Sequence, residues 1–204
     1  MMLGHHVGLR AIEPSDLPQL LLWRNQPELR QLFREYRELS SVHQQAWFDK
    51  VVMGDERTRM FAIVDRKSGA LLGACGLCYI DWVNRSADFS IYLGADNLYI
   101  DDALGDEGLA VDAARVMLTY GKNELGLHRF WAEIYDFDTP KQTFFDTLGF
   151  QLDGRHRETH WTRGRWCDSL FYSLMAREVE PLVLVSDAFT DHTLGAAHLV
   201  GATP

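Results

Sequence analysis

The stretch 81–150 limits the folds open to this chain more than any other part of it. It predicts, in order, a strand, a long loop, a helix, a strand and a second helix, carried by SADFSIYLG, NLYIDDALGDEG, LAVDAARVMLTYGKNELG, LHRFWAEIYDF and a segment that closes on DTLGF. Adjacent parallel strands need a crossover connection long enough to contain a helix. The order strand, helix, strand therefore predicts a parallel pair. The loop before the first helix contains glycine, and the backbone N–H groups at a helix N-terminus bind anions. The stretch therefore predicts a βαβ unit with an anion-binding turn.

The residues before this unit predict an antiparallel extension of its sheet. VGLRAIEP alternates like a short strand, and a helix follows from about Asp16 until Pro27 ends or kinks it. A second helical stretch begins near Ser41. The segments FAIVD and ALLGACGLCYI flank a turn at 67–69, which predicts a hairpin that leads into the βαβ unit.

The residues after the unit complete the expected fold. We predict helices over 109–124 and from 139 or 140 to 148, then a last hairpin with its turn at Arg163 and Gly164. The first of these helices has one apolar stripe, formed by Leu109, Ala113, Val116, Met117 and Tyr120. The whole is an α+β (mixed α/β) fold: a central mixed, mostly antiparallel sheet with one βαβ crossover and helices on both faces. We assign residues 1–180 to a single domain and 181–204 to a C-terminal extension or tail.

Composition excludes several classes of protein. The formal net charge of −9 argues against a nucleic-acid or anionic-membrane partner, since either needs a basic surface. The chain shows no signal peptide and no apolar run of membrane-spanning length, so we expect it in the cytoplasm. Its three cysteines form no disulfide framework, and the pair Cys75 and Cys78 lies in an apolar strand without a second pair at zinc spacing. We expect no metal site.

The order of the elements, with the strings inside them, resembles the GNAT acetyltransferase superfamily over roughly residues 7–178. LRAIEPSDLPQLLLWRN is similar to the opening strand and helix of the branch that contains ribosomal-protein alanine and amino-sugar N-acetyltransferases. ADFSIYL is similar to its central strand, and ELGLHRFWAEIY and FFDTLGFQLDGRHRE resemble its later helix end, strand and C-terminal core. The resemblance implies acetyl-CoA as cosubstrate and a small-molecule amine as partner, and it leaves a homodimer open.

The resemblance also implies a coenzyme site, from which this sequence departs at several positions. Gly105 stands where the family has Arg or Gln, and Asp106 and Glu107 add charge that repels a diphosphate by about 1 kcal/mol each. Asp138 replaces a usual Asn, and Phe145 replaces the Tyr that many members use to protonate the leaving thiolate. The expected coenzyme-binding residues are Ile91, Tyr92, Leu93, Gly105, Glu107, Gly108, Leu109, Ala110, Asp138, Lys141 and Phe145.

Acetyl transfer to an amine needs a group that takes up a proton, and two strand carboxylates are suited to it. The resemblance implies that the sheet splays between the two parallel strands, and alternation places Asp88 and Glu133 on polar strand faces that meet there. We predict Asp88 as the general base, with Glu133 second. Tyr135, or alternatively Tyr92, could serve as the acid.

A structural interpretation of these carboxylates stays open. Both would then be strand-surface acids paired with Arg85 or Arg129. We place Cys75 and Cys78 away from the seam between the parallel strands, and so expect no cysteine nucleophile.

The N-terminal helical region offers candidate acceptor-binding residues. Arginine suits phosphate or carboxylate, and aromatic rings suit a base or sugar face. The candidates are Trp23, Arg24, Arg34 and Tyr36. In the competing interpretation the arginines of this region belong to a solvated helix face and pair with Glu28, Glu35 and Glu38. These arginines are Arg24, Arg30, Arg34 and Arg37.

Three functions follow from these observations. The first is N-acetyl transfer from acetyl-CoA to an amino sugar, including a nucleotide-linked one, or to another small amine. The second is acetylation of protein N-termini by the same chemistry. The third is a catalytically silent module that retains the fold, which the unusual coenzyme loop and Phe145 favour.

Overall fold

The computed structural model describes residues 1–101 and 108–182. Its centre is one sheet of eight strands in the order β1-β2-β3-β4-β5-β6-β8-β7, in which every neighbouring pair is antiparallel except β5 and β6. The strands are β1 (Met2–Leu3), β2 (Val7–Ala11), β3 (Arg59–Asp65), β4 (Leu71–Asp81), β5 (Ser86–Leu93), β6 (Arg129–Tyr135), β7 (Gln151–Thr162) and β8 (Arg165–Met175). This confirms the mixed, mostly antiparallel sheet with one βαβ crossover; the two-residue β1 was not predicted.

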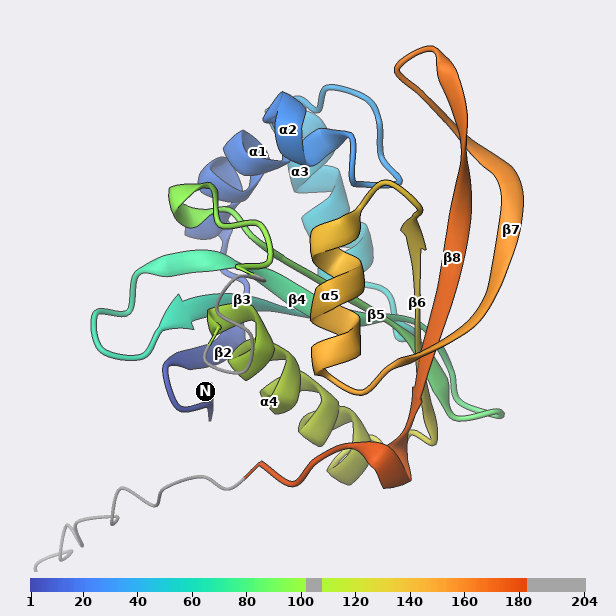
Figure 1. Cartoon of the computed structure of the whole chain (residues 1–204). Coiled ribbons are helices and arrows are strands. Elements are labelled where there is room, and N and C mark those ends of the chain that lie inside the picture. The colour runs from blue at the N-terminus through green and yellow to red at the C-terminus, as the bar shows by residue number, and fades with distance from the viewer. Residues whose placement is uncertain (102–107, 183–204) are drawn as a thin grey trace, which may run out of the picture.

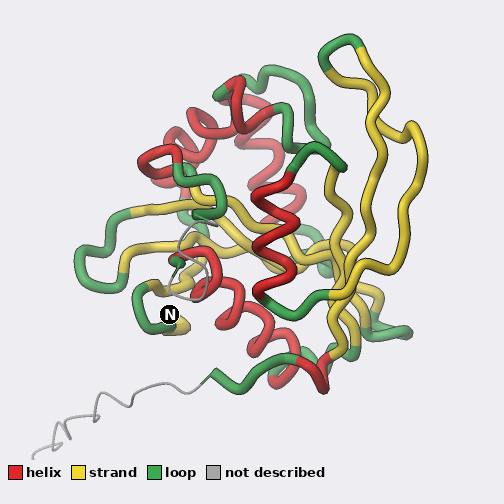
Figure 2. The backbone as a smooth tube through the Cα atoms, in the orientation of Figure 1, coloured by secondary structure: helices red, strands yellow, loops and turns green. Residues whose placement is uncertain are grey.

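Helices cover both faces of this sheet. Figure 1 places α4 and α5 in front of the sheet and groups α1, α2 and α3 behind it, and Figure 2 shows the same two layers along the backbone. The helices are α1 (Leu17–Asn25), α2 (Pro27–Arg30), α3 (Ser41–Trp47), α4 (Leu109–Asn123) and α5 (Thr139–Thr147). Short helical turns precede α1 (Pro14–Asp16), follow α3 (Phe48–Val52), follow β5 (Ala95–Asn97) and follow β8 (Ala176–Glu178). Among the described residues, none of these helices has the length and apolar content needed to span a bilayer.

The start of each N-terminal helix follows from its first residues. Pro27 occupies the first position of α2, where its missing N–H costs no hydrogen bond, so the predicted break separates α1 from α2. Ser40 caps α3 by accepting from the His43 amide. The hairpin turns expected at 67–69 and at Arg163 and Gly164 are confirmed, with Gly69 and Gly164 in the left-handed region.

α4 is held on the sheet by its predicted apolar stripe and by one glycine. Ala113, Val116 and Met117 are buried, and the helix contacts β2, β4 and β5. A Cβ at Gly121 would lie 2.6 Å from the Phe130 ring, so only glycine lets the helix approach β6 this closely. Gly121 therefore sets how closely the C-terminal part of α4 packs on the sheet.

The aromatic core lies between the sheet and α5. Phe145 is fully buried, and its ring centroid lies 4.8 Å from that of Phe150 and 5.6 Å from that of Tyr172. Removing such a ring costs about 3–5 kcal/mol in other proteins. Phe145, expected at the coenzyme, therefore also stabilises the fold.

The two parallel strands separate soon after their first paired residues. The βαβ strands pair from Ser86 with Arg129 only to Asp88 with Trp131, although both strands continue beyond these residues. The strands thus diverge, as the resemblance implied.

The extension predicted at 181–204 lies outside the described residues from 183 onward.

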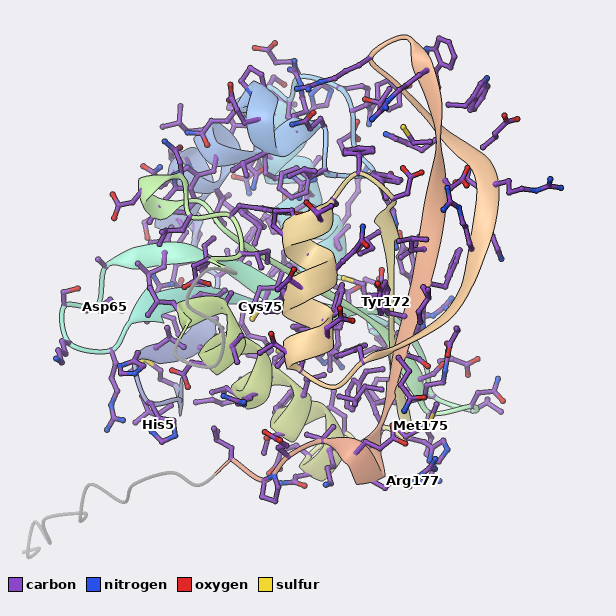
Figure 3. The ribbon with its side chains drawn as sticks, viewed as in Figure 1. His5, Asp65, Cys75, Tyr172, Met175 and Arg177 are labelled. Carbon is purple, nitrogen blue, oxygen red and sulfur yellow. The ribbon has the colours of Figure 1, made fainter. Side chains whose placement is uncertain are left out.

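The N-terminal turn is fastened to α4 by one buried carboxylate. Asp112 accepts from the backbone amides of His5, His6 and Val7 at 2.9, 2.7 and 3.0 Å, and His5 lies beside the start of α4 (Figure 3). A Cβ at Gly4 would lie 2.5 Å from the Asp112 carboxylate, which leaves room for glycine alone.

Replacing Asp112 with Ala should destabilise the protein by about 2–4 kcal/mol, because three backbone donors lose a charged acceptor. Urea unfolding monitored by circular dichroism would measure this, and the amides of His5, His6 and Val7 should exchange faster with deuterium. Asp146→Ala, at an exposed position on α5, is the matched control. A loss below about 0.5 kcal/mol, the range of ordinary surface changes, would contradict this role.

Candidate active site

The divergence of β5 and β6 opens a cavity of about 380 Å³. Its lining comes from both diverging strands, the segment between α2 and α3, the outer end of β4, and α5, with further residues from α1, α3 and the segment between α3 and β3. Asp88 and Glu133 both line it, as predicted from strand alternation. The structure therefore brings the two candidate carboxylates together in one cavity.

Arg34 joins the two carboxylates. Its Nη1 donates to Asp88 Oδ2 at 2.7 Å, and its Nη2 lies 3.5 Å from Glu133 Oε2. The pairing with Arg85 or Arg129 is therefore wrong: Arg129 pairs with Asp153 at 2.8 Å, and the main-chain oxygen of Arg85 accepts from His128. Arg34 lies 54 residues from Asp88 in the chain, so strand alternation gives no hint of the contact.

The exposure of these groups differs in a way that matters for chemistry. The Asp88 side chain is 6% exposed, that of Glu133 27% and that of Arg34 41%. Burial raises the pKa of Asp88 above its ordinary value, and the positive charge of Arg34 opposes that rise. Asp88 is thus a carboxylate whose affinity for a proton depends on the cation beside it.

Two aromatic rings face the same guanidinium. The Arg34 carbon Cζ lies 5.9 Å from the centroid of Tyr79 and 6.0 Å from that of Trp131. Tyr79 has a φ of 50° and lies where the pairing of β4 with β5 shifts register between Cys78 and Asp81. Such a bulge redirects a side chain, and here it directs Tyr79 toward Arg34. Tyr79 was not among the residues predicted for the site.

A chain of hydroxyl groups extends from Glu133. Ser169 is fully buried and donates to Glu133 Oε1 at 2.6 Å. Thr159 lies 2.7 Å from the Ser169 oxygen and donates to it, because the Ser169 proton is already committed. These contacts fix the orientation of the Glu133 carboxylate. They arise from the register of β8 with β6, which the sequence alone did not provide.

Cys78 corrects one expectation. It lies directly opposite Asp88 on β4 and lines the cavity, so it is not remote from the seam between β5 and β6. Burial raises the pKa of the Cys78 thiol to about 12 and also raises that of Cys75, which leaves both as unreactive thiols near neutral pH. The expectation of no cysteine nucleophile agrees with these directions.

Neither candidate tyrosine is among the described residues that line the cavity. Tyr135 is buried and stacks on His160 with a centroid distance of 3.8 Å. Tyr92 meets Phe33 edge to face at 5.2 Å, and burial raises the Tyr92 pKa to about 12. The acid role of Tyr135 stays a prediction.

The strand edge expected to meet the coenzyme already has partners within the chain. Lys141 Nζ donates to the Ile91 carbonyl at 3.0 Å, and the Leu93 amide donates to the Tyr99 carbonyl at 2.6 Å. The segment after Leu93 achieves this with left-handed backbone at Tyr99 and Asp101, an uncommon conformation for residues other than glycine. No local pattern in the sequence predicts that this segment folds back on β5.

The first backbone amides of α4 also have a hydrogen-bond partner within the chain. Asp101 accepts from the Leu109 amide at 2.6 Å and from the Ala110 amide at 3.1 Å. Gly108 is the N-cap residue of α4. The expected contacts of Gly105 and Glu107 lie outside the described residues.

Asp138 and Lys141 form part of the same buried network. The Asp138 carboxylate caps α5 by accepting from the Lys141 amide at 3.3 Å, and it accepts the Tyr99 hydroxyl at 2.5 Å. Burial lowers the Lys141 pKa, and the negative charges of Asp138 and Asp88 oppose that shift. Asp138 thus has a structural role beside the strand edge that is expected to meet the coenzyme.

The candidate acceptor residues are divided by the fold. Arg24 and Arg34 line the cavity, and Arg24 lies over the Phe33 ring at 4.9 Å. Trp23 is buried, and a Cβ at Gly94 would lie 2.1 Å from its ring, so Trp23 is a core residue and its burial argues against contact with an acceptor. Tyr36 is 76% exposed and faces the β7–β8 hairpin, outside the cavity.

Comparison with known proteins gives a consistent assignment. A sequence profile described as Acetyltransferase (GNAT) domain matches residues 6–151. The putative ribosomal N-acetyltransferase YdaF of Bacillus subtilis is 25% identical over 185 residues, covering 87% of this chain and 95% of that protein. A spermidine N(1)-acetyltransferase of Escherichia coli K12 is 27% identical over 173 residues, covering 82% and 84%.

A solved structure has the same fold. The spermidine N-acetyltransferase of Vibrio cholerae, in complex with CoA and spermine, superimposes with a TM-score of 0.72 at 20% identity, covering 85% of this chain and 98% of that one. The profile match extends over more than half of the chain and includes β5, β6 and the cavity between them. The chain therefore belongs to the GNAT family of acetyl-CoA-dependent N-acetyltransferases.

Proposed function

We propose that this protein transfers an acetyl group from acetyl-CoA to a small cationic amine, with Asp88 as the general base. The observation that carries the proposal is the pair of carboxylates, Asp88 and Glu133, in the cavity where β5 and β6 diverge. An amine that acts as a nucleophile has to lose a proton, and a buried carboxylate with a raised pKa is suited to take it.

The described residues fit the coenzyme at the strand edge and at the start of α4. The main-chain groups of Ile91 and Leu93 would bind its extended arm, and the amides of Leu109 and Ala110 would bind its diphosphate. When bound, acetyl-CoA would supply the thioester carbonyl that the amine attacks. The same polar groups now bind Lys141, Tyr99 and Asp101, so coenzyme binding has to exchange these internal contacts.

The residues of the chain would handle the protons. Asp88 would accept one proton from the acceptor ammonium, which frees the nitrogen lone pair for attack as the new C–N bond forms and the C–S bond breaks. The second proton that the nitrogen loses would go to the leaving thiolate. Glu133, oriented by Ser169, keeps a second negative charge beside the acceptor. Phe145 cannot donate a proton, and a thiolate can leave without a dedicated acid.

The charges around the cavity favour a cationic acceptor over a nucleotide-linked sugar. Its lining contains four carboxylates and three cations: Glu35, Asp55, Asp88 and Glu133 against Arg24, Arg34 and Lys141. Arg30 and Arg37, the other arginines of this region, pair with Glu38 and Glu35 at 3.3 and 2.6 Å, as the competing interpretation of that face expected. Few cations therefore remain for a phosphate, and a spermidine-like amine fits better.

Other acceptors stay as alternatives within the same chemistry. An amino sugar without a nucleotide presents an ammonium group of the same kind. The relative named as a ribosomal N-acetyltransferase makes a protein N-terminus the next candidate. A silent module would bind acetyl-CoA weakly and cleave none.

Asp88→Asn should lower kcat at least ~100-fold, because a general base typically contributes a factor of 10²–10⁴. Free-thiol release from acetyl-CoA, with spermidine, glucosamine and an N-terminal peptide as acceptors, would measure it. Glu133→Gln should have a smaller effect. The affinity of either variant for the coenzyme should change by less than about twofold, since neither carboxylate lies at the start of α4, where the diphosphate would bind.

Asp153→Asn is the matched control for these variants, because Asp153 pairs with Arg129 on the same sheet and lies outside the cavity. An Asp88→Asn enzyme with native kcat would remove Asp88 from the mechanism. If the native protein released no thiol with any acceptor, the silent module would be the better account.

Asp101→Asn should bind acetyl-CoA more tightly, by about three- to tenfold, because it removes a negative charge that competes for the α4 amides. Calorimetric titration with CoA would give the ratio, and Asp96→Asn, exposed on the same segment, is the control. Weaker binding by Asp101→Asn alone would indicate that Asp101 organises the coenzyme site instead of competing for it.

A further inference from the structure

The guanidinium of Arg34 lies in a setting suited to an organic cation. Carboxylate oxygens of Asp88 and Glu133 lie 2.7 and 3.5 Å from its nitrogens. The rings of Tyr79 and Trp131 lie about 6 Å from its central carbon, at 5.9 and 6.0 Å. Two carboxylates and two aromatic faces are what an alkylammonium ion would also bind. We name these four residues the cation box.

Arg34 is more open to solvent than either carboxylate that it contacts. It comes from the segment between α2 and α3, which contains turns and bends but no helix or strand around this residue. Its side chain is 41% exposed, whereas that of Asp88 is 6% exposed. Because the guanidinium side of this half-buried ion pair is open to solvent, a cation from solvent can reach Asp88 and replace Arg34. The buried carboxylate, in contrast, needs some cation beside it.

We propose that Arg34 takes the place of the acceptor's ammonium group in the free protein and leaves the cation box when the acceptor binds. The identity of that ligand as an acceptor rests on the proposed function. Arg34 is then a residue that determines specificity: only a ligand that brings its own positive charge can take over the contacts to Asp88 and Glu133. Neutral or anionic acceptors gain nothing from displacing it.

This exchange would also prepare the base. While Arg34 is in contact, its fixed charge favours the ionised form of Asp88. An ammonium ion in its place satisfies the same carboxylate and can give up a proton, which guanidinium does not do near neutral pH. Displacement therefore joins acceptor binding to the first proton transfer.

Calorimetric titration of the full chain without acetyl-CoA tests the proposal. Arg34→Ala should bind spermidine at least ~5-fold more tightly than the native protein, because an internal competitor for the same two carboxylates is gone. Methylguanidinium should bind to Arg34→Ala and not measurably to the native chain. Arg30→Ala is the control, because Arg30 lies on α2 and pairs with Glu38. It should leave the affinities for spermidine and for methylguanidinium unchanged.

Equal or weaker spermidine binding by Arg34→Ala would overturn the proposal. Binding of uridine diphosphate by the native chain that is lost in Arg34→Ala would do the same, since Arg34 would then recognise an anion. Arg34→Gln serves if the alanine variant does not fold. In the native chain, the Arg34 Nε–H resonance should shift on saturation with spermidine, and an unchanged resonance would also contradict displacement.

The proposed function can fail separately. If Arg34→Ala gains cation affinity while the native protein never cleaves acetyl-CoA, the displacement of Arg34 is supported and the proposal of acetyl transfer is rejected. If the native protein acetylates amines and Arg34→Ala shows no gain, the reverse holds.

Discussion

The divergence of β5 and β6 beyond Asp88 is the constraint on which the candidate site depends. The parallel pairing stops at Asp88 and Trp131, so beyond these residues the two strands no longer pair with each other and a cavity lies between them. Strand alternation then places Asp88 and Glu133 on the same side of that opening. Two carboxylates this close require a cation, and the segment between α2 and α3 supplies Arg34.

The same logic extends to the coenzyme side of the opening. Polar groups that a cosubstrate would bind have partners from the chain itself: Lys141 at Ile91, Tyr99 at Leu93, and Asp101 at the first amides of α4. Buried backbone groups are costly without partners, so a binding cleft is stabilised when side chains satisfy it in the absence of ligand. Each ligand then binds by exchange, which lowers apparent affinity and rejects ligands that lack the matching charge.

Much of the fold could be predicted from the sequence, because it follows local patterns. Alternation, the glycine turns and Pro27 predicted the strands, hairpins and helix break, and the apolar stripe of α4 predicted its buried face. The resemblance of ELGLHRFWAEIY and of FFDTLGFQLDGRHRE to the family identified the crossover and, with it, the place of Asp88 and Glu133. These features depend on residues that are near one another in the chain.

What could not be predicted depends on contacts between distant segments. Arg34 reaches Asp88 from an irregular segment, and Cys78 faces Asp88 only because of the register of β4 with β5. Trp23 has the chemistry of a sugar-binding residue and is buried because Gly94 leaves room for its ring. Asp101 reaches α4 through left-handed residues that no period of hydrophobicity specifies. Residue type indicated the chemistry of the region, and tertiary packing decided which side chains enter the cavity.

A crystal structure of the protein with CoA and spermidine tests the central claim most directly. The account predicts an amine nitrogen of spermidine within hydrogen-bonding distance of Asp88 and Glu133, with the Arg34 guanidinium displaced toward solvent. A complex in which spermidine binds elsewhere, while Arg34 keeps both carboxylates, would contradict it.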